Sequence, residues 1–374
     1  MRIAVFHNLP LGGARRTLLE QMKGLSKKHT LDLYEFENNN ESFMDLSKFA
    51  DRVYKYDFQL ENNYPGFINR LVRDYKNFIS LYFVHKKIAA DIDKRRYEVV
   101  FVHTDKYTES PYILRFLKTP NIYHCHELLR IAYEKVLAFD EDVFIVKKWY
   151  ENTTRLIRKY IDKTNARSAY IIVTSSIYIK DKVKKIYRKA AVCLHLGVDT
   201  KVFKPNNFKR DDYILYIGGR NKLKGYDLVH QLKKLLSKEI KIKELGFLKA
   251  DTLIKNDTKL AETYSKALIT LCPARSEPMG LVQLESMACG TPVVAVNEGG
   301  YRGSIVDGIT GYLLPRDAKV FADKIKYLIG NPKLVDKMGK AGRQHIEKRF
   351  TWEGHVRKLE KLLIKVANEK KIYK

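Results

Sequence analysis

The chain has few cysteines and no long hydrophobic run. Its 374 residues include four cysteines, none of them in a Cys-x-x-Cys pair: Cys125, Cys193, Cys272 and Cys289. This usage is typical of reduced thiols in a cytosolic protein and argues against a disulfide framework. No stretch of 18 apolar residues occurs, which excludes a membrane-spanning helix. Met1–Phe6 is typical of a strand and not of a signal peptide, so we expect a cytoplasmic protein.

Acidic residues are also scarce. The chain has 43 Asp and Glu against 70 Lys and Arg, which gives a formal net charge of +27. Such a field attracts anionic partners, among them nucleotide diphosphates, nucleic acids and the anionic inner face of a membrane. No RNA-recognition signature, zinc finger or helix-turn-helix pattern is present, so the sequence disfavours nucleic acid as the partner.

Strand and helix signals alternate along the chain in two successive sets. Because this alternation is typical of parallel sheets wrapped by helices, we predict an α/β fold with two Rossmann-like, doubly wound domains. A turn-rich segment, residues 197–205, separates the two sets. The expected strands are Arg2–His7, His29–Phe36, Glu98–His103, Pro120–Cys125, Tyr170–Thr174, Tyr213–Ile217, Lys241–Leu245, Ala267–Pro273 and Pro292–Val296. The expected helices include Ala14–Leu25, Ser110–Leu117, Tyr226–Leu236, Leu260–Ser265, Leu281–Ala288 and Trp352–Ala367.

The most informative segment is residues 276–295, where Glu277 and Glu285 stand eight positions apart. It follows a buried-strand pattern, and Pro278 is suited to be the first residue of a helix. Glu277 is then expected in the strand-to-helix turn and Glu285 about two turns along the helix, roughly 10–12 Å away. This separation suits two carboxylates that hold opposite ends of one extended polar ligand. It is too wide for a nucleophile and acid pair, which needs about 5–9 Å.

The backbone between the two glutamates offers a second kind of contact. If the helix begins at Pro278, the amides of Met279, Gly280 and Leu281 form its N-terminus. Free amides at a helix N-terminus are a ready site for phosphate.

A glutamate, seven residues and a glutamate, followed by Ala-Cys-Gly-Thr-Pro-Val-Val-Ala, closely resembles the donor-site signature of the family 4 retaining glycosyltransferases. The resemblance runs over most of the chain and is strongest for residues 213–315. It implies the GT-B fold, in which two Rossmann-like domains face an interdomain cleft. An acceptor-side domain of residues 1–196 would be completed by a returning C-terminal helix, 353–374, and residues 197–352 would bind the nucleotide sugar. It further implies that Glu277 binds hydroxyls of the transferred sugar and that Glu285 holds the ribose.

A second motif is the glycine-containing turn of residues 216–227, between a strand and a helix. A departing nucleoside diphosphate gains negative charge, which Arg220 and Lys224 can meet as fixed cations beside Gly219. The family has an arginine and a lysine here, although the shorter spacing leaves Lys222 as an alternative to Lys224. Many glycosyltransferases use a metal ion at Asp-x-Asp instead. The two such spacings here, 91–93 and 140–142, are typical of solvated faces, so we expect neither a metal ion nor another cofactor.

Two features of the first half complete the candidate site. Gly12 and Gly13 permit close backbone approach to a phosphate, and a similar turn in the family faces the diphosphate, although the pair is equally typical of a plain tight turn. In residues 122–127, His124 and His126 share one face of a strand end. His126 matches the family's histidine near the transferred sugar, and this His-rich version resembles α-mannosyltransferases that build lipid-linked glycans. His124 is expected in the core, whereas His103 is equally typical of a core residue and of a site residue. The pattern disfavours a metal site.

Two features leave the substrate open. Gly303 stands where the family usually has a glutamate, which leaves acceptor contacts and donor preference undetermined. In residues 67–82, apolar residues recur at helical spacing among lysines and arginines, a pattern typical of a core helix and also of a helix in the membrane interface. The apolar positions are Phe67, Ile68, Leu71, Val72, Tyr75, Phe78, Ile79 and Tyr82.

The sequence therefore predicts a metal-independent, retaining hexosyltransferase. We expect a GDP-mannose or UDP-sugar donor and a glycan or lipid-linked acceptor, with peripheral contact to an anionic membrane. A nucleotide-sugar epimerase or a phosphorylase on the same fold is the first alternative. The second is a non-catalytic basic protein that binds nucleic acid or membrane.

Overall fold

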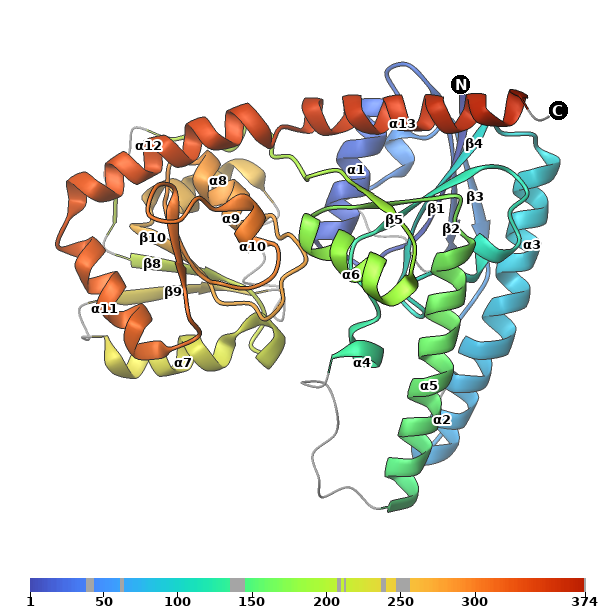
Figure 1. Cartoon of the computed structure of the whole chain (residues 1–374), viewed down its shortest axis with the longest axis horizontal. Helices are drawn as coiled ribbons and strands as arrows, with labels where there is room; N and C mark the ends of the chain where they lie inside the picture. Colours follow the sequence, from blue (N-terminus) through green and yellow to red (C-terminus); the bar gives the residue numbers. More distant parts are fainter. Residues whose placement is uncertain are drawn as a thin grey trace. The chain divides into compact units, whose positions relative to one another are not determined.

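The computed structural model describes residues 1–37, 44–60, 64–134, 145–206, 210–211, 213–236, 240–246 and 256–372. It divides into two compact units, shown in Figure 1. Unit 1 comprises Met1–Ser175, Ile179–Leu194 and Val356–Lys374, and unit 2 comprises Ser176–Tyr178 and His195–His355. Each unit is described by itself below.

Unit 1 is built on a seven-stranded sheet in the order β3-β2-β1-β4-β5-β6-β7, with every neighbouring pair parallel. Nearly every residue of β1 and β4 is buried, because helices cover both faces of a parallel sheet. The strands are β1 Arg2–Asn8, β2 Thr30–Phe36, β3 Arg52–Tyr56, β4 Val99–Asp105, β5 Asn121–Cys125, β6 Ile171–Thr174 and β7 Ala191–Cys193. The helices that belong with this sheet are α1 Gly13–Leu25, α2 Gly66–Tyr75, α3 Leu81–Lys94, α4 Arg130–Tyr133, α5 Ile145–Ser168 and α6 Ile177–Tyr187.

Unit 2 repeats this architecture on a smaller scale. Its five parallel strands lie in the order β12-β11-β10-β8-β9. They are β8 Tyr213–Ile217, β9 Lys241–Leu245, β10 Ile269–Cys272, β11 Val293–Val296 and β12 Gly311–Leu314. The helices are α7 Tyr226–Leu235, α8 Asp257–Lys266, α9 Val282–Ala288, α10 Tyr301–Ser304, α11 Ala318–Ile329 and α12 Pro332–Arg349.

The last helix, α13, spans Trp352–Ile372. Its residues from Val356 onward belong to unit 1, where Leu359, Leu363 and Val366 are fully buried in the core around Ile3. At the surface, Glu360 pairs with His29 and Lys28 at 3.2 and 3.3 Å. Among the described residues, no helix combines the length and the apolar character that a bilayer-crossing segment requires.

The predicted strands and most predicted helices agree with the structure to within a few residues. The helix predicted over Ser110–Leu117 is wrong, since only a short 3-10 turn, Tyr112–Arg115, forms there. Side chains of other elements bind the backbone at both ends of this segment and compete with helix formation. Asp162 accepts hydrogen bonds from the Ser110 amide and hydroxyl, and Asp93 accepts the amides of Lys118 and Thr119.

Asp162 on α5 is a buried carboxyl group in unit 1. Its Oδ1 accepts a 2.7 Å hydrogen bond from the Ser110 hydroxyl, and its Oδ2 accepts one of 2.7 Å from the Tyr187 hydroxyl. Burial raises the pKa of Asp162 to about 6, although these hydrogen bonds lower it in part. Folding therefore favours the protonated carboxyl group.

This pKa predicts that Asp162 makes the fold less stable as the pH rises. Between the unfolded pKa near 3.8 and the folded pKa of about 6, the folded state binds more protons, so its contribution falls by on the order of 3 kcal/mol. Urea unfolding from pH 4 to 7 should show that fall in wild type and a smaller one in Asp162→Asn. Parallel stability curves for the two proteins would contradict the prediction.

Candidate functional site

The candidate site in unit 2 lies where β8 and β10 end. The two strands are parallel neighbours, so the loops that follow them meet at one edge of the sheet. The Arg275 amide donates a 2.8 Å hydrogen bond to the Leu223 carbonyl, which joins the two loops. Gly225 has a φ of +72°, and a Cβ there would overlap the Pro273 backbone. The close contact of the two loops therefore requires glycine at this position.

Glu277 and Lys224 meet at this contact. The Lys224 ammonium lies 3.2 Å from Glu277 Oε2, with the carboxylate mostly buried and the lysine side chain 46% exposed. Ion pairs of this exposure contribute about 0–1 kcal/mol to stability. The pair therefore does little for the fold, and its main effect is to place a cation and a carboxylate side by side at the sheet edge.

Arg220 is held from the side by Glu244 on β9. Its Nε and Nη2 atoms donate hydrogen bonds of 3.0 and 2.8 Å to Glu244 Oε2. Burial raises the pKa of Glu244, but the hydrogen bonds from Lys233 and Arg220 outweigh it and leave that pKa below its usual value. The carboxylate thus stays ionised and fixes the guanidinium of Arg220, whose side chain is 65% exposed. The preceding turn is shaped by the Tyr216 hydroxyl, which donates to the Gly219 carbonyl.

Glu285 is buried, and its Oε2 accepts a 2.9 Å hydrogen bond from the Tyr264 hydroxyl. The predicted position of Glu285 on the helix is wrong, because α9 begins at Val282 and Glu285 lies in its first turn. Pro278 is not helical, and Leu281 is the N-cap residue. The reason is Gly280, whose φ of +77° interrupts the helical path.

The predicted helix N-terminus over residues 279–281 is therefore also wrong. Met279 is almost fully buried, and Met279 and Gly280 precede the helix. Their amides belong to the loop that carries Glu277. As donors to a phosphate, Met279, Gly280 and Leu281 stay a prediction.

The loop that carries Glu277 rests on a second glycine pair. The Gly300 amide donates a 2.7 Å hydrogen bond to the Glu277 carbonyl. Gly299 has a φ of +58°, and a Cβ on either glycine would overlap the backbone of residues 276–279. The contacts of these two glycines therefore hold the backbone of Glu277 in place.

Gly300→Ala should consequently disturb the site, whereas Gly303→Ala should not. A Cβ at Gly303, three residues further in the same turn, meets nothing within 4 Å. We expect Gly300→Ala to lose about 1–3 kcal/mol of stability through overpacking and to weaken nucleotide-sugar binding. Gly303→Ala should be neutral or slightly stabilising. Urea unfolding and calorimetric titration check both, and equal behaviour of the two variants would contradict the prediction.

Unit 1 carries the remaining predicted residues. Gly12 has a φ of +149° with open space around its Cβ position, and Gly13 is the first residue of α1. His126, at the end of β5, lies with its Nε2 atom 3.0 Å from His103 Nδ1 and stacks on His124. Ring nitrogens of the three histidines lie within 4.8 Å of one another, an arrangement that could hold a metal ion. Their polar neighbours include Gln21 and Ser175, which hydrogen-bond to His124.

The two Asp-x-Asp spacings have different outcomes. Asp93 accepts a hydrogen bond from the Thr119 backbone amide. Asp91 accepts one from the Tyr56 hydroxyl and forms an ion pair with Arg95. Both side chains are partly exposed, in line with their interpretation as solvated, and each also has structural partners in unit 1. Asp140 and Asp142 lie outside the described residues.

Sequence reasoning missed the side chains that hold the candidate site residues. Glu244 and Tyr264 belong to no recognisable motif, and each meets its partner from a separate element, β9 or α8. Only the strand order brings them beside Arg220 and Glu285.

Comparison with known proteins agrees with this architecture. Residues 242–345 match the family described as glycosyl transferases group 1. The chain is 39% identical over 101 residues to an alpha-maltose-1-phosphate synthase of Mycobacterium tuberculosis, and 42% identical over 95 residues to a D-inositol 3-phosphate glycosyltransferase of Kribbella flavida. Each match covers 25% of this chain, and it covers 26% of the first relative and 22% of the second. The chain thus spans about a quarter of the length of these curated relatives.

Solved structures resemble the chain over nearly its whole length. Sucrose-phosphate synthase from Thermosynechococcus elongatus has a TM-score of 0.72 at 18% identity, with 98% of each chain covered. The Anabaena protein HepE in complex with UDP-glucose also has a TM-score of 0.72, at 15% identity, with 98% of this chain and 100% of that chain covered. The predicted α/β fold with two Rossmann-like domains of the GT-B type is confirmed.

Proposed function

Because residues 242–345 match the glycosyl transferases group 1 family, we propose that this chain is a glycosyltransferase that takes a hexose from a nucleotide diphosphate sugar. The observation that carries the proposal is the pairing of Glu277 with Lys224 where β8 and β10 end. Ligands of parallel α/β sheets bind at this edge. A carboxylate beside a lysine, with Arg220 on the same β8 loop, offers groups for both the hydroxyls and the diphosphate of such a donor.

Each group has a role that follows from its chemistry. Arg220 and Lys224 offset the negative charge that grows on the leaving diphosphate. Glu277 accepts hydrogen bonds from hydroxyls of the transferred sugar. Glu285, whose carboxylate is oriented by Tyr264, accepts from the ribose. Gly12, Gly13, Gly219 and the amides of residues 279–281 are proposed contacts to the donor, and His126 to the sugar.

We propose transfer with retention of the anomeric configuration and without a metal ion. The bond from the anomeric carbon to the diphosphate oxygen breaks, and a bond to the acceptor hydroxyl oxygen forms on the same face. The acceptor proton moves to the departing phosphate oxygen, so no enzymic nucleophile is required. The charge that a metal ion would otherwise balance is met by Arg220 and Lys224.

A panel of sugar nucleotides tests the proposal. The panel begins with GDP-mannose, the donor expected from the sequence. It also contains UDP-N-acetylglucosamine and UDP-glucose, the latter because the similar Anabaena protein was crystallised with it. We expect one donor to bind in calorimetry and to be hydrolysed slowly without an acceptor. Binding of none would refute the proposal. Isomerisation of the donor, or phosphate-dependent cleavage, would assign the fold to an epimerase or a phosphorylase.

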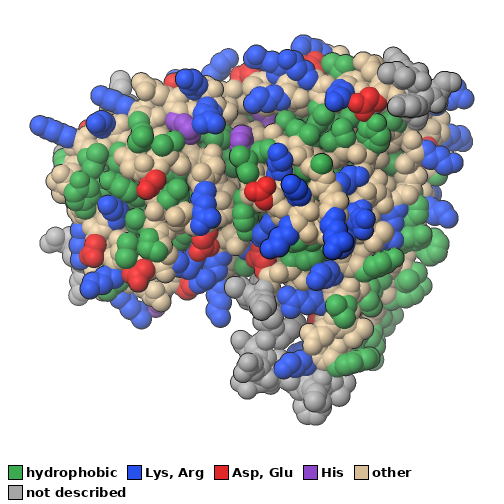
Figure 2. All heavy atoms as spheres, in the orientation of Figure 1, with side chains coloured by type: hydrophobic (Ala, Val, Ile, Leu, Met, Phe, Trp, Pro, Cys, Tyr) green, Lys and Arg blue, Asp and Glu red, His purple; other side chains and the backbone are tan. Residues whose placement is uncertain are grey.

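The helices α2 and α3 support a further part of the proposal, contact with an anionic membrane. The interpretation of residues 67–82 as a core stripe is wrong for five of its apolar side chains, which are 44–61% exposed: Phe67, Ile68, Leu71, Tyr75 and Ile79. Polar residues take the inner positions instead, since Asp74 and Asn77 are each only 5% exposed. Figure 2 shows hydrophobic side chains along this part of the molecule, at the lower right, with Lys and Arg side chains nearby.

The charges around the exposed apolar residues of α2 and the following turn indicate what this surface binds. Arg73, Lys86 and Lys87 on the same helices are exposed. Apolar and aromatic side chains flanked by cations suit the headgroup region of an anionic bilayer. A second copy of the chain would bring like charges together at its own stripe. We therefore propose that this face rests on an anionic membrane surface.

Vesicle flotation should show this contact directly. We expect wild type to bind phosphatidylserine vesicles at least about tenfold more strongly than the triple variant Phe67→Ser, Leu71→Ser and Tyr75→Ser, because three exposed apolar side chains that would enter the headgroup region are lost. The matched control replaces three exposed apolar residues of unit 2, Leu235, Ile309 and Tyr327, by serine. Equal binding of the two triple variants would contradict the proposal.

A further inference from the structure

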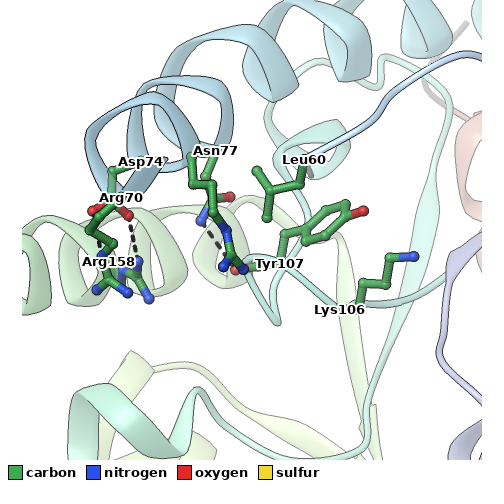
Figure 3. Close-up of a pocket in the computed structure, with 8 residues that line it drawn as sticks. Leu60, Arg70, Asp74, Asn77, Lys106, Tyr107 and Arg158 are labelled. Carbon is green, nitrogen blue, oxygen red and sulfur yellow. Dashed lines mark hydrogen bonds and ion pairs between the residues drawn. The ribbon is translucent and has the colours of Figure 1, made fainter. Parts of the chain in front are cut away.

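Unit 1 contains a pocket of about 390 Å³ that no candidate site residue lines. It lies between α2, the turn after β4 and the long helix α5, and Figure 3 shows its side chains. Four of the lining residues are cations, namely Arg70, Arg73, Lys106 and Arg158. All lining residues belong to unit 1, so the pocket is complete within one compact unit.

The charge of the pocket is strongly positive. Of the described residues that line it, Asp74 alone carries a negative charge. Asp74 accepts from Arg70 at 3.0 Å and from Arg158 at 2.6 Å, and Arg70 also donates to Glu151 at 2.9 Å. These contacts fix the two guanidinium groups, and dashed lines in Figure 3 mark those that involve Asp74. Fixed guanidinium groups recognise phosphate and carboxylate with little loss of side-chain entropy.

Two further cations are less restrained. Arg73 and Lys106 line the pocket from opposite elements, α2 and the turn after β4, and both are exposed. The Lys106 amide donates a 3.0 Å hydrogen bond to the Asn8 carbonyl, at the end of β1. The pocket therefore adjoins the sheet edge where β1 and β4 end, the edge that binds ligands in parallel α/β folds.

A buried amide provides an independent sign of a ligand. Asn77 lines the pocket, is only 5% exposed, and its Oδ1 atom has no hydrogen-bond partner among the described residues. Its Nδ2 atom donates to the Tyr107 carbonyl at 3.5 Å, so the oxygen is the atom left over. A buried acceptor without a donor costs about 1–3 kcal/mol. A ligand hydroxyl would supply that donor.

We propose that this pocket binds the acceptor through an anionic group, a phosphate or a carboxylate, on a molecule that also carries a hydroxyl beside it. The assignment as acceptor rests on the proposed transferase function, whereas the anion binding does not. A phosphate of this kind occurs on soluble polyol or sugar phosphates and on lipid headgroups. In either case Arg70 and Arg158 hold the anion, Arg73 and Lys106 close on it, and Asn77 accepts from the hydroxyl.

Calorimetric titration with inorganic phosphate and with glycerol 3-phosphate tests this directly. We expect wild type to bind both with a Kd of about 1 mM or tighter, and the double variant Arg73→Gln, Lys106→Gln to bind at least about tenfold more weakly, since each lost charge-assisted hydrogen bond is worth about that factor. The matched control is Lys184→Gln, Lys185→Gln, which removes the same charge from exposed positions of α6 in unit 1 and should bind like wild type. Asn77→Leu should weaken glycerol 3-phosphate binding and leave inorganic phosphate binding unchanged.

The outcomes separate this proposal from the transferase function. Absence of phosphate binding, or equal weakening in the two double variants, would overturn the pocket even if a sugar nucleotide binds in unit 2. Phosphate binding without any sugar nucleotide affinity would keep the anion site and refute the transferase. Thermal melting confirms that the variants fold. The single variant Lys106→Gln separates the two sources, because Lys106 lines the pocket without flanking the apolar stripe of residues 67–82. A soluble source is assigned if glycerol 3-phosphate binding alone depends on Lys106, and a lipid source if binding to phosphatidic acid vesicles depends on it as well.

Discussion

Replacing Glu277 by glutamine is expected to lower sugar transfer by about a hundredfold to a thousandfold. The neutral amide accepts weaker hydrogen bonds from the sugar hydroxyls than the carboxylate does, and the ion pair with Lys224 is also lost. Such pairs contribute at most about 1 kcal/mol to stability, so the variant should still fold. The measurement is the transfer rate at saturating donor, together with thermal melting.

The matched control is Glu353→Gln, an exposed carboxylate in the first turn of α13. It removes the same charge from unit 2 without touching the β8 and β10 loops, and it should retain full activity. If Glu277→Gln also retains full activity, Glu277 does not belong to the site. If the two variants lose activity equally, the effect is one of net charge.

Lys224→Met and Lys222→Met should differ by two orders of magnitude in their effect on transfer. The two lysines share one 3-10 turn, but it is the Lys224 ammonium that lies 3.2 Å from Glu277. We expect Lys224→Met to lower kcat about a hundredfold or more, since a fixed cation beside the leaving diphosphate is lost. Lys222, which is exposed, should tolerate the change within about threefold.

Methionine keeps most of the apolar stem and removes only the charge, so packing changes little. The turn itself is held by the Lys224 backbone, whose amide donates to the Asn221 side chain at 2.9 Å, and this contact survives the substitution. Steady-state kinetics and nucleoside diphosphate titration give the comparison. A larger loss in Lys222→Met would assign the diphosphate contact to Lys222 instead.

Patterns of short range were read correctly from the sequence, and those that depend on neighbours were not. The apolar runs of β1, β8 and β10 reveal buried strands because a strand covered on both faces buries nearly all of its residues and is therefore continuously apolar. The helix over Ser110–Leu117 failed because Asp162 on α5 and His85 on α3 accept hydrogen bonds from its Ser110 and Ile113 amides. The helix start at Pro278 failed because Gly280 takes a left-handed conformation, and because Gly299 and Gly300 pack against the backbone of residues 276–279.

The apolar stripe of residues 67–82 shows the same limit. Its spacing specifies a helix with an apolar face but not where that face points. The structure turns the face outward, since Asp74 is drawn inward by Arg70, Arg158 and the Tyr150 hydroxyl. Arg70 belongs to the same helix as Asp74, but Tyr150 and Arg158 stand on α5, 76 and 84 residues away along the chain, so no local pattern could reveal them.

By itself, the sequence determined the α/β class, the two successive domains and the motif around Glu277 and Glu285, because each of these is a local pattern. The tertiary structure alone decided that Lys224 reaches Glu277, that Glu244 fixes Arg220 and that four cations from three elements form one pocket. The physical reason is that strand order and loop packing set these distances. Residues far apart along the chain share a site only after the sheet edges have formed.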